Sequence, residues 1–217
     1  KIIQAKHPER LESAGLYLTC LGEIIAQGYN TASSAKKWSR SCEVFGASGG
    51  AVFYDVQIFD QLGLFDENFP MGYEDAEYAM RCFTHNIKVT YTSDSIVHHQ
   101  GGVSLKKTPE IPRLIQTQYQ IWAVYFQYAP WICVGWIFFL TVFRTIFKTL
   151  YWILFFRWRS IKAWYSSIFL FLNRFKILLS ERKKKRAKIQ ISSWQFIKGH
   201  RGIISEIHRF VLAIWFR

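Results

Sequence analysis

The charge of the chain changes abruptly near Pro112, and this change limits the folds that are open to the sequence. Residues 1–112 carry 10 Lys and Arg against 13 Asp and Glu, whereas residues 113–217 carry 18 against 2. Eight of the nine Trp also lie in the second part. Because 50% of the residues are hydrophobic, the chain is not a disordered tail. We therefore expect two physically different regions, 1–112 and 113–217.

The basic region combines a concentrated positive charge with Trp, which is typical of proteins at a membrane–water interface. Thirty residues between Arg113 and Arg144 carry no formal charge, a length that could cross about 30 Å of hydrocarbon. Four Gln and Pro130 interrupt this stretch, and Lys148 follows it closely, so we favour interfacial helices and keep a single span as the alternative. The basic run Glu181–Lys188 fits attraction to anionic lipids. An anionic membrane surface is the expected partner, in preference to nucleic acid.

The first region alternates short apolar runs with helix signals, which indicates an α/β layer. Asp55 is placed to cap one helix, and Asn86 is suited to end another. Residues Val56, Phe59 and Leu62 are expected to share one face of the first helix. The expected strands are 15–22, 51–53, 87–91 and 95–98, and the expected helices are 56–62 and 74–86.

Asp75 is the strongest candidate for chemistry. A carboxylate in the first turn of a helix is favoured in its ionised form by the macrodipole, and it can accept a proton from an attacking hydroxyl group. Glu74, Asp75 and Glu77 could equally serve only to cap the helix, and their spacing does not separate the two interpretations. Nearby, Gly49 and Gly50 could form a tight wall beside a sugar.

His98 and His99 are neighbours, so on a strand their rings point to opposite faces and only one can readily bind an ion. Such a histidine is more often structural than a ligand. However, Gly101 and Gly102 follow directly and would let backbone amides approach a phosphate, and Ser104 could add a hydroxyl group.

Three motifs occur in order: Gly-Leu-Phe-Asp-Glu-x-Phe at 63–69, Tyr-Glu-Asp at 73–75 and His-x-Gly-Gly-x-Ser at 99–104. Together with the Gly-rich loop at 46–50, they resemble the C-terminal portion of the catalytic domain of family 2 glycosyltransferases, especially bacterial rhamnosyltransferase-like members. The resemblance covers roughly residues 1–108. It implies an α/β fold, a partial GT-A (nucleotide-diphospho-sugar transferase-like) domain over 1–112, followed by an α-helical membrane-associated region over 113–217.

The resemblance also implies roles for individual residues. Asp75 corresponds to the catalytic base of an inverting transfer, and His99 to a metal ligand, with His98 as the alternative register. The expected cofactor is Mg²⁺ or Mn²⁺, which suits oxygen ligands with one imidazole. Glu77 departs from the family pattern, which has Asp at this place. The expected substrate-binding residues are Gly49, Gly50, Glu74, Glu77, Arg81, Gly101, Gly102 and Ser104.

These implications predict an inverting glycosyltransferase of cell-surface polysaccharide synthesis. It would move a sugar from a nucleoside-diphosphate sugar to a glycan or lipid-linked acceptor at the cytoplasmic face of the cell membrane, attached peripherally or by a single span. Nothing in 1–217 resembles the Asp-x-Asp half of such enzymes, so we expect the C-terminal part of a longer enzyme, inactive alone. The alternative is a non-catalytic peripheral membrane protein whose acidic region binds a partner.

Overall fold

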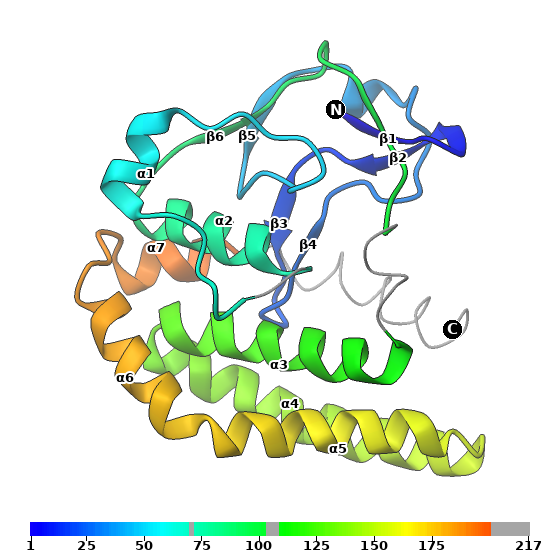
Figure 1. The fold of residues 1–217 in the computed structure, drawn as a ribbon, viewed down its shortest axis with the longest axis vertical. Coiled ribbons are helices and arrows are strands. Elements are labelled where there is room, and N and C mark those ends of the chain that lie inside the picture. Colours follow the sequence, from blue (N-terminus) through cyan, green and yellow to red (C-terminus); the bar gives the residue numbers. More distant parts are fainter. Residues whose placement is uncertain (70–71, 103–108, 201–217) are drawn as a thin grey trace.

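The computed structural model describes residues 1–69, 72–102 and 109–200. A mixed α/β part lies on a layer of long helices (Figure 1), so the general α/β class and the helical second region are confirmed. The strands are β1 (Ile2–Gln4), β2 (His7–Ser13), β3 (Leu16–Leu18), β4 (Ile24–Ala26), β5 (Cys42–Val44), β6 (Val89–Tyr91) and β7 (Val97–His99). The helices are the 3-10 turn η1 (Lys36–Trp38), α1 (Val56–Leu62), α2 (Glu74–Thr84), α3 (Glu110–Tyr128), α4 (Trp131–Leu154), α5 (Trp158–Asn173), α6 (Phe175–Arg186) and α7 (Ser193–Lys198).

β1 is the strand that brings distant parts of the chain together. It lies between β2, which is antiparallel to it, and β7, which is parallel to it and pairs His98 with Ile3 and His99 with Gln4. β3 with β4 and β5 with β6 form further antiparallel pairs. The histidine-bearing strand is therefore fixed beside the start of the chain.

The strand expected at 51–53 is wrong. The chain turns here instead, since the Ala51 N–H donates to the Ser48 carbonyl, and residues 51–55 join no ladder. The Phe53 side chain is fully exposed. The strands expected at 15–22, 87–91 and 95–98 are confirmed in part of each range by β3, β6 and β7.

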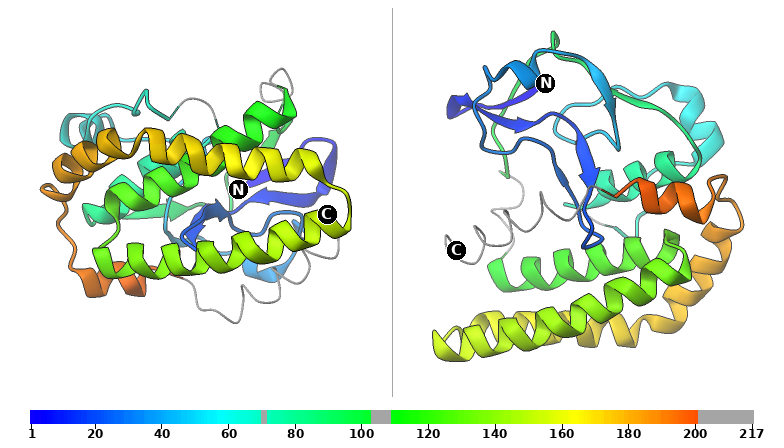
Figure 2. Two further views of the ribbon diagram at one scale, coloured as in Figure 1. Left: turned by 90° about the horizontal axis from the view of Figure 1, so that it is seen from below. Right: turned by 180° about the vertical axis from the view of Figure 1, so that it is seen from behind.

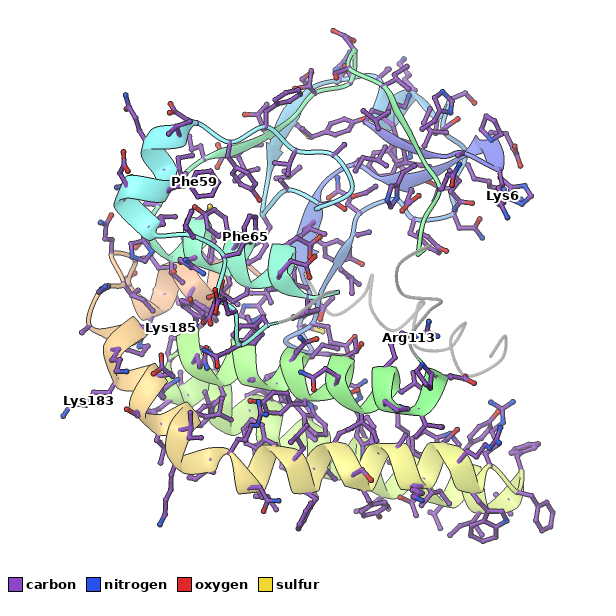
Figure 3. All side chains as sticks on the ribbon, viewed as in Figure 1. Lys6, Phe59, Phe65, Arg113, Lys183 and Lys185 are labelled. Atoms are coloured by element: carbon purple, nitrogen blue, oxygen red, sulfur yellow. The ribbon has the colours of Figure 1, made fainter. Side chains whose placement is uncertain are left out.

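α1 has the predicted ends, because the Asp55 carboxylate accepts a hydrogen bond from the Gln57 N–H at 3.0 Å and Gly63 follows the last turn with φ 78°. Val56 is exposed, so the apolar face of this helix is not buried along its whole length. The helix docks instead through Phe59, which joins Phe65 and the α2 residue Tyr78 in an aromatic cluster with centroids 4.9–6.3 Å apart (Figure 3).

α2 ends at Thr84, slightly before the predicted limit, and Asn86 adopts the left-handed conformation with φ 57°. The helix lies above α3, which in turn covers α4 and α5 (Figures 1 and 2). Pro130 separates α3 from α4, as the sequence indicates, whereas α4 continues through Arg144 and Lys148 for 24 residues. This helix is long and apolar enough to cross a membrane.

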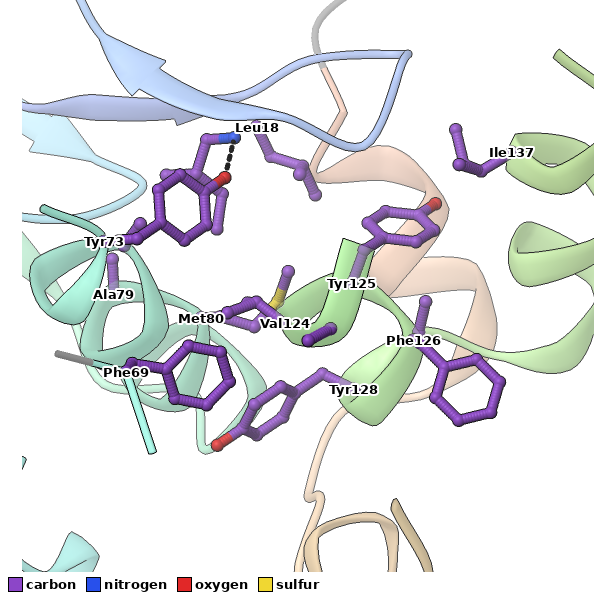
Figure 4. Close-up of a cluster of buried hydrophobic side chains, with 14 of the residues drawn as sticks. Leu18, Phe69, Tyr73, Ala79, Met80, Val124, Tyr125, Phe126, Tyr128 and Ile137 are labelled. Atoms are coloured by element: carbon purple, nitrogen blue, oxygen red, sulfur yellow. Dashed lines mark hydrogen bonds between the residues drawn. The ribbon is translucent and has the colours of Figure 1, made fainter. Parts of the chain in front are cut away.

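A hydrophobic core is shared by the two regions. Leu18 and Met80 from the first region pack with Val124 and Tyr128 from α3 (Figure 4). Within this core, the Tyr73 hydroxyl accepts a hydrogen bond from an amide of β4 at 2.9 Å. The start of α2 is therefore held by the sheet on one side and by α3 on the other.

Candidate functional site

Asp75 lies in the first turn of α2 with its carboxylate turned toward the glycine-rich loop. One carboxylate oxygen accepts a hydrogen bond from the Gly49 N–H at 2.8 Å, and the other accepts from the Ala76 N–H at 2.7 Å. A Cβ atom on Gly49 would lie 3.3 Å from the Cβ of Asp75. The loop backbone therefore packs directly on this carboxylate.

The loop approaches α2 closely because of Gly46. A Cβ atom at Gly46 would lie 2.1 Å from the Cβ of Ala79, a separation that real Cβ atoms do not show. On its other side, the Gly46 carbonyl accepts a hydrogen bond from the Leu16 N–H at 2.7 Å. Gly46 thus joins β3 to α2, and the glycines that follow it are held over the start of the helix.

His99 lies on the other side of the same loop. Its Nδ1 is 2.6 Å from a carboxylate oxygen of Glu12, at the end of β2. A Cβ atom on Gly50 would lie 3.4 Å from the His99 ring. A carboxylate that holds Nδ1–H leaves Nε2 with its lone pair, which is the usual arrangement of a metal-binding imidazole. Glu12 therefore orients His99.

Asp75 and His99 are brought together by two adjacent glycines. Because Asp75 touches Gly49 and His99 touches Gly50, and neighbouring Cα atoms are about 3.8 Å apart, the carboxylate and the imidazole are within about 14 Å of each other. The two residues come from different elements, α2 and β7. Asp75 and His99 therefore flank one two-glycine segment, Asp75 at Gly49 and His99 at Gly50.

Gly101 and Gly102 continue this edge of the site. They have φ 45° and φ 66°, in the left-handed region that glycine adopts without strain. Gly101 lies against the Glu12 carboxylate, and a Cβ on Gly102 would meet no atom within 4 Å. His98 is exposed on the opposite face of β7. Ser104 lies outside the described residues, so its predicted role stays a prediction.

The Glu74 carboxylate is bonded to the backbone just before α2. Its carboxylate accepts hydrogen bonds from the backbone amides of Gly72 and Tyr73, the two residues before the helix. These bonds satisfy the kind of free donors that precede a helix. The contacts are those of a residue that shapes the turn beside Asp75, and a contact of Glu74 with substrate stays a prediction.

Glu77 and Arg81 lie on a different side of α2 from Asp75, where the helix meets α3 and α6. Glu77 is fully buried, and it accepts hydrogen bonds from the Arg81 guanidinium, the Tyr128 hydroxyl and, at 3.0 Å, the Lys185 ammonium group. The Arg81 guanidinium also donates to the carbonyls of Leu62 and Leu64 in the turn after α1. We call Glu77, Arg81, Tyr128 and Lys185 the interhelical junction; substrate binding by Glu77 and Arg81 stays a prediction.

Within the basic run Glu181–Lys188, Lys185 does not point toward solvent. Its ammonium group also donates to Asp66 and Gln127, each at 2.8 Å, so it points into the protein, whereas Lys183 points outward (Figure 3). The sequence predicts either a solvated helix end or attraction to anionic lipids for the run as a whole. No local signal distinguishes Lys185, because its partners lie 58 to 119 residues away.

Burial raises the pKa of the Asp75 carboxyl above its ordinary value. The amides of Gly49 and Ala76 oppose this shift by stabilising the carboxylate, and the negative charge of Glu74 adds to it. A base with a raised pKa binds a proton more strongly than an exposed carboxylate does. Burial thus outweighs the backbone amides that stabilise the ionised form of Asp75.

The described residues supply only part of a metal site. His99 and Glu12 offer an imidazole nitrogen and carboxylate oxygens, and no group of three or more His, Cys, Asp or Glu in the described ranges is placed to hold an ion. Mg²⁺ requires near-octahedral coordination. These two residues fit a divalent cation only with further ligands from substrate, water or another segment.

A cavity of about 360 Å³ opens beside the glycine-rich loop. Its walls include Ser13 and Gly15 from the end of β2 and the start of β3, and Ala47 and Ser48 from the loop itself. Asp75 and His99 do not line this cavity, which lies beside the loop rather than between the two residues. Comparisons with protein-family models, curated proteins and solved structures found no match to the chain.

Proposed function

We propose that the chain is the acceptor-side part of an inverting glycosyltransferase of the family 2 type, with a partial GT-A fold. The observation that carries the proposal is the placement of Asp75 and His99 against the adjacent glycines Gly49 and Gly50. The motifs that resemble the family are scattered through the sequence. Two of the motif residues flank one two-glycine segment, a placement that a catalytic centre would use and that helix capping alone does not require.

In the proposed reaction, the Asp75 carboxylate accepts the proton of an acceptor hydroxyl as its oxygen attacks the anomeric carbon of a nucleoside-diphosphate sugar. The diphosphate leaves from the opposite side of that carbon, so the configuration inverts. His99, which Glu12 orients, faces the diphosphate. The Gly101 and Gly102 backbone, which carries no side chains, lets its amides approach the diphosphate. A bound Mg²⁺ or Mn²⁺ would supply Lewis-acid neutralisation of the departing diphosphate.

The nucleotide would bind to a segment outside these 217 residues. The α/β part supports this division, because it exposes large apolar side chains on loops and strand ends. Exposed apolar side chains of this kind are available to contact another segment. They include Phe53, Val56, Leu64, Ile96 and Val97.

The helical layer would hold the site at the cytoplasmic face of a membrane. α4 exposes most of its apolar residues, and the net charge of residues 113–217 suits anionic lipids. The acceptor is a glycan or a lipid-linked glycan of cell-surface polysaccharide synthesis. A lipid-linked acceptor would be concentrated at this surface.

The test is Asp75→Asn in the longer enzyme, with Asp60→Asn as the matched control because Asp60 is exposed on α1. General-base catalysis contributes about 10²–10⁴-fold, so Asp75→Asn should lower kcat by at least about 100-fold and leave the Kd for the donor unchanged. Asp60→Asn should retain activity. Equal activity of the two variants would refute the proposal and favour a non-catalytic membrane protein.

The pH dependence gives a second readout. Because only ionised Asp75 can accept a proton and burial raises its pKa, activity should fall on the acid side at a pH above about 4, the ordinary value for Asp. The acid limb of kcat/KM against pH should therefore be displaced upward. An acid limb at or below about pH 4 would contradict the role of a buried base.

A further inference from the structure

An apolar groove of about 750 Å³ lies in the helical layer, between α4 and α5, with α3 as its floor. Almost all of its walls are hydrocarbon or aromatic surface. Residues that line it include Trp122 and Phe126 from α3, Phe138 and Val142 from α4, and Phe171 and Leu172 from α5.

The groove exists because α4 and α5 touch at one end only. Near the turn that joins them, the Thr149 hydroxyl lies 3.0 Å from the Tyr165 hydroxyl, and the Trp164 Nε1–H donates to the Thr145 hydroxyl at 3.1 Å. Away from this turn the two helices diverge, as the view from below in Figure 2 shows. Gly135 lines the wider part, and a Cβ atom there would meet nothing within 4 Å. The helices thus leave an apolar space that their own side chains do not fill.

The surroundings of the groove identify hydrocarbon as its environment. α4 also exposes Ile132, Phe139, Phe143 and Phe147, a face that water would hydrate unfavourably. The same helix is long and apolar enough to enter a bilayer. A groove between such helices is filled by the chains of lipids rather than by water, which needs polar partners.

The charges next to the groove identify the lipid class. Arg174 and Lys176 are exposed on either side of Phe175, which lines the groove where α5 gives way to α6. Among the described residues, neither cation has a carboxylate partner within 4.0 Å. The Arg174 guanidinium lies 5.4 Å from the centroid of the Tyr119 ring. Two exposed cations that flank a residue of the groove wall match a phosphate head group joined to a hydrocarbon chain.

One ion pair indicates that α4 lies along one leaflet and does not cross the bilayer. Arg144, the fourteenth of the 24 residues of α4, pairs with Glu23 of the α/β part at 2.9 Å. A helix that crossed the bilayer would carry this pair, and the loop that bears Glu23, into the hydrocarbon centre, where charges are costly. The Arg144–Glu23 pair avoids this free-energy cost only if α4 lies along the membrane surface.

We propose that the groove between α4 and α5 binds an acyl chain of an anionic phospholipid from the leaflet that contacts the helical layer, with the phosphate at Arg174 and Lys176. The binding rests on the proposed membrane attachment but not on glycosyl transfer.

The first experiment measures retained lipid. The protein is reconstituted with dioleoyl phosphatidylglycerol, extracted into mild detergent, and the bound lipid is counted by native mass spectrometry. Gly135→Trp and Val142→Trp fill the groove, whereas Leu150→Trp is the matched control, because Leu150 is exposed on α4 but does not line the groove. We expect retention in the wild type and in Leu150→Trp, and at least a tenfold loss in both groove variants.

Circular dichroism and vesicle pelleting of each variant show that the fold and membrane binding persist, so loss of lipid reports the groove. Removal of both charges in Arg174→Gln/Lys176→Gln should abolish the preference for phosphatidylglycerol over phosphatidylcholine. Retention of phosphatidylglycerol by both groove variants, or retention of polyprenyl phosphate alone by the wild type, would overturn the proposal. These measurements do not use transferase activity, so their outcome is independent of the proposed reaction.

The second experiment tests the single leaflet. A thiol introduced by Arg159→Cys, beyond the turn after α4, is compared with the native exposed thiol of Cys42 in the α/β part. A bulky maleimide added to sealed vesicles should modify both thiols from the same side. Protection of the introduced thiol while Cys42 reacts would show that α4 spans the membrane and would refute the single-leaflet arrangement.

Discussion

Replacement of Lys185 by Met should destabilise the protein far more than the same replacement at its neighbour Lys184. Lys185 donates hydrogen bonds to Asp66, Glu77 and Gln127, at 2.8, 3.0 and 2.8 Å, and its side chain is largely buried. Met keeps the hydrocarbon stem but removes the charge. Loss of one partner from a buried ion pair costs about 3–5 kcal/mol where the other charge is left without compensation. Asp66 would lose the only cation that pairs with it among the described residues, whereas Glu77 would keep Arg81.

Lys184 is the control within the same run. It pairs only with Glu181 among the described residues, its side chain is mostly exposed, and such surface pairs contribute at most about 1 kcal/mol. For a protein of this size, a loss of about 4 kcal/mol at Lys185 corresponds to a fall of about 10 °C in the unfolding midpoint. Thermal and chemical unfolding in the same detergent measure both variants. Equal, small losses of stability on replacement of Lys184 and of Lys185 would show that Glu77 is not buried in an interhelical junction from which water is excluded.

The pH dependence of the Lys185→Met effect provides a further check. Burial by itself raises the pKa of Asp66, but the hydrogen bond and charge of Lys185, together with two hydrogen bonds from Asn68, outweigh it and lower that pKa below its ordinary value. A carboxyl group with a lowered pKa in the folded state contributes stability above its unfolded pKa of about 4, and this contribution is lost as the pH falls through the folded value. The difference in stability between wild type and Lys185→Met should therefore narrow below about pH 4. A constant difference across this range would contradict the pairing of Asp66 with Lys185.

Three further predictions concern the site and the membrane surface. Gly46→Ala should lower both the stability and the sugar-transfer activity of the longer enzyme. The added Cβ would lie 2.1 Å from the Cβ of Ala79 and would push the loop away from α2. An unchanged unfolding midpoint would refute this close approach. Asp75→Asn should leave the unfolding midpoint at pH 7 unchanged or higher, because an ionised group with a raised pKa destabilises the folded state above that pKa; a large loss would identify Asp75 as a structural cap. Lys184→Gln should weaken binding to anionic vesicles about fivefold, at about 1 kcal/mol per exposed cation, whereas equal weakening by Lys185→Gln in folded protein would contradict the inward position of Lys185.

Much of the candidate site could be predicted from the sequence because its signals are local. The Asp55 cap and Gly63 define α1, and the acidic first turn of α2 places Asp75 at a helix start. The partner of His99 could not be predicted in this way. Glu12 is 87 residues from His99, and the two meet only because β7 pairs in parallel with β1, which pairs with β2.

The same limit applies to the charged residues. Glu77 and Arg81 are four residues apart along α2 and form an ion pair, as this spacing on a helix allows. That both serve the interhelical junction depends on where α3 and α6 pack. The error at residues 51–53 has a similar origin, since a short apolar run becomes a strand only where another strand lies beside it.

The sequence alone determined the acidic α/β region, the basic helical region and the break at Pro130, because charge, helix capping and proline geometry act within a few residues. Only the tertiary structure decided that Gly49 and Gly50 separate Asp75 from His99, that Lys185 turns inward from a basic run, and that α4 and α5 diverge to leave an apolar groove. These features depend on the register of strands and the crossing of helices. Both are set by the packing of side chains that are distant in the chain.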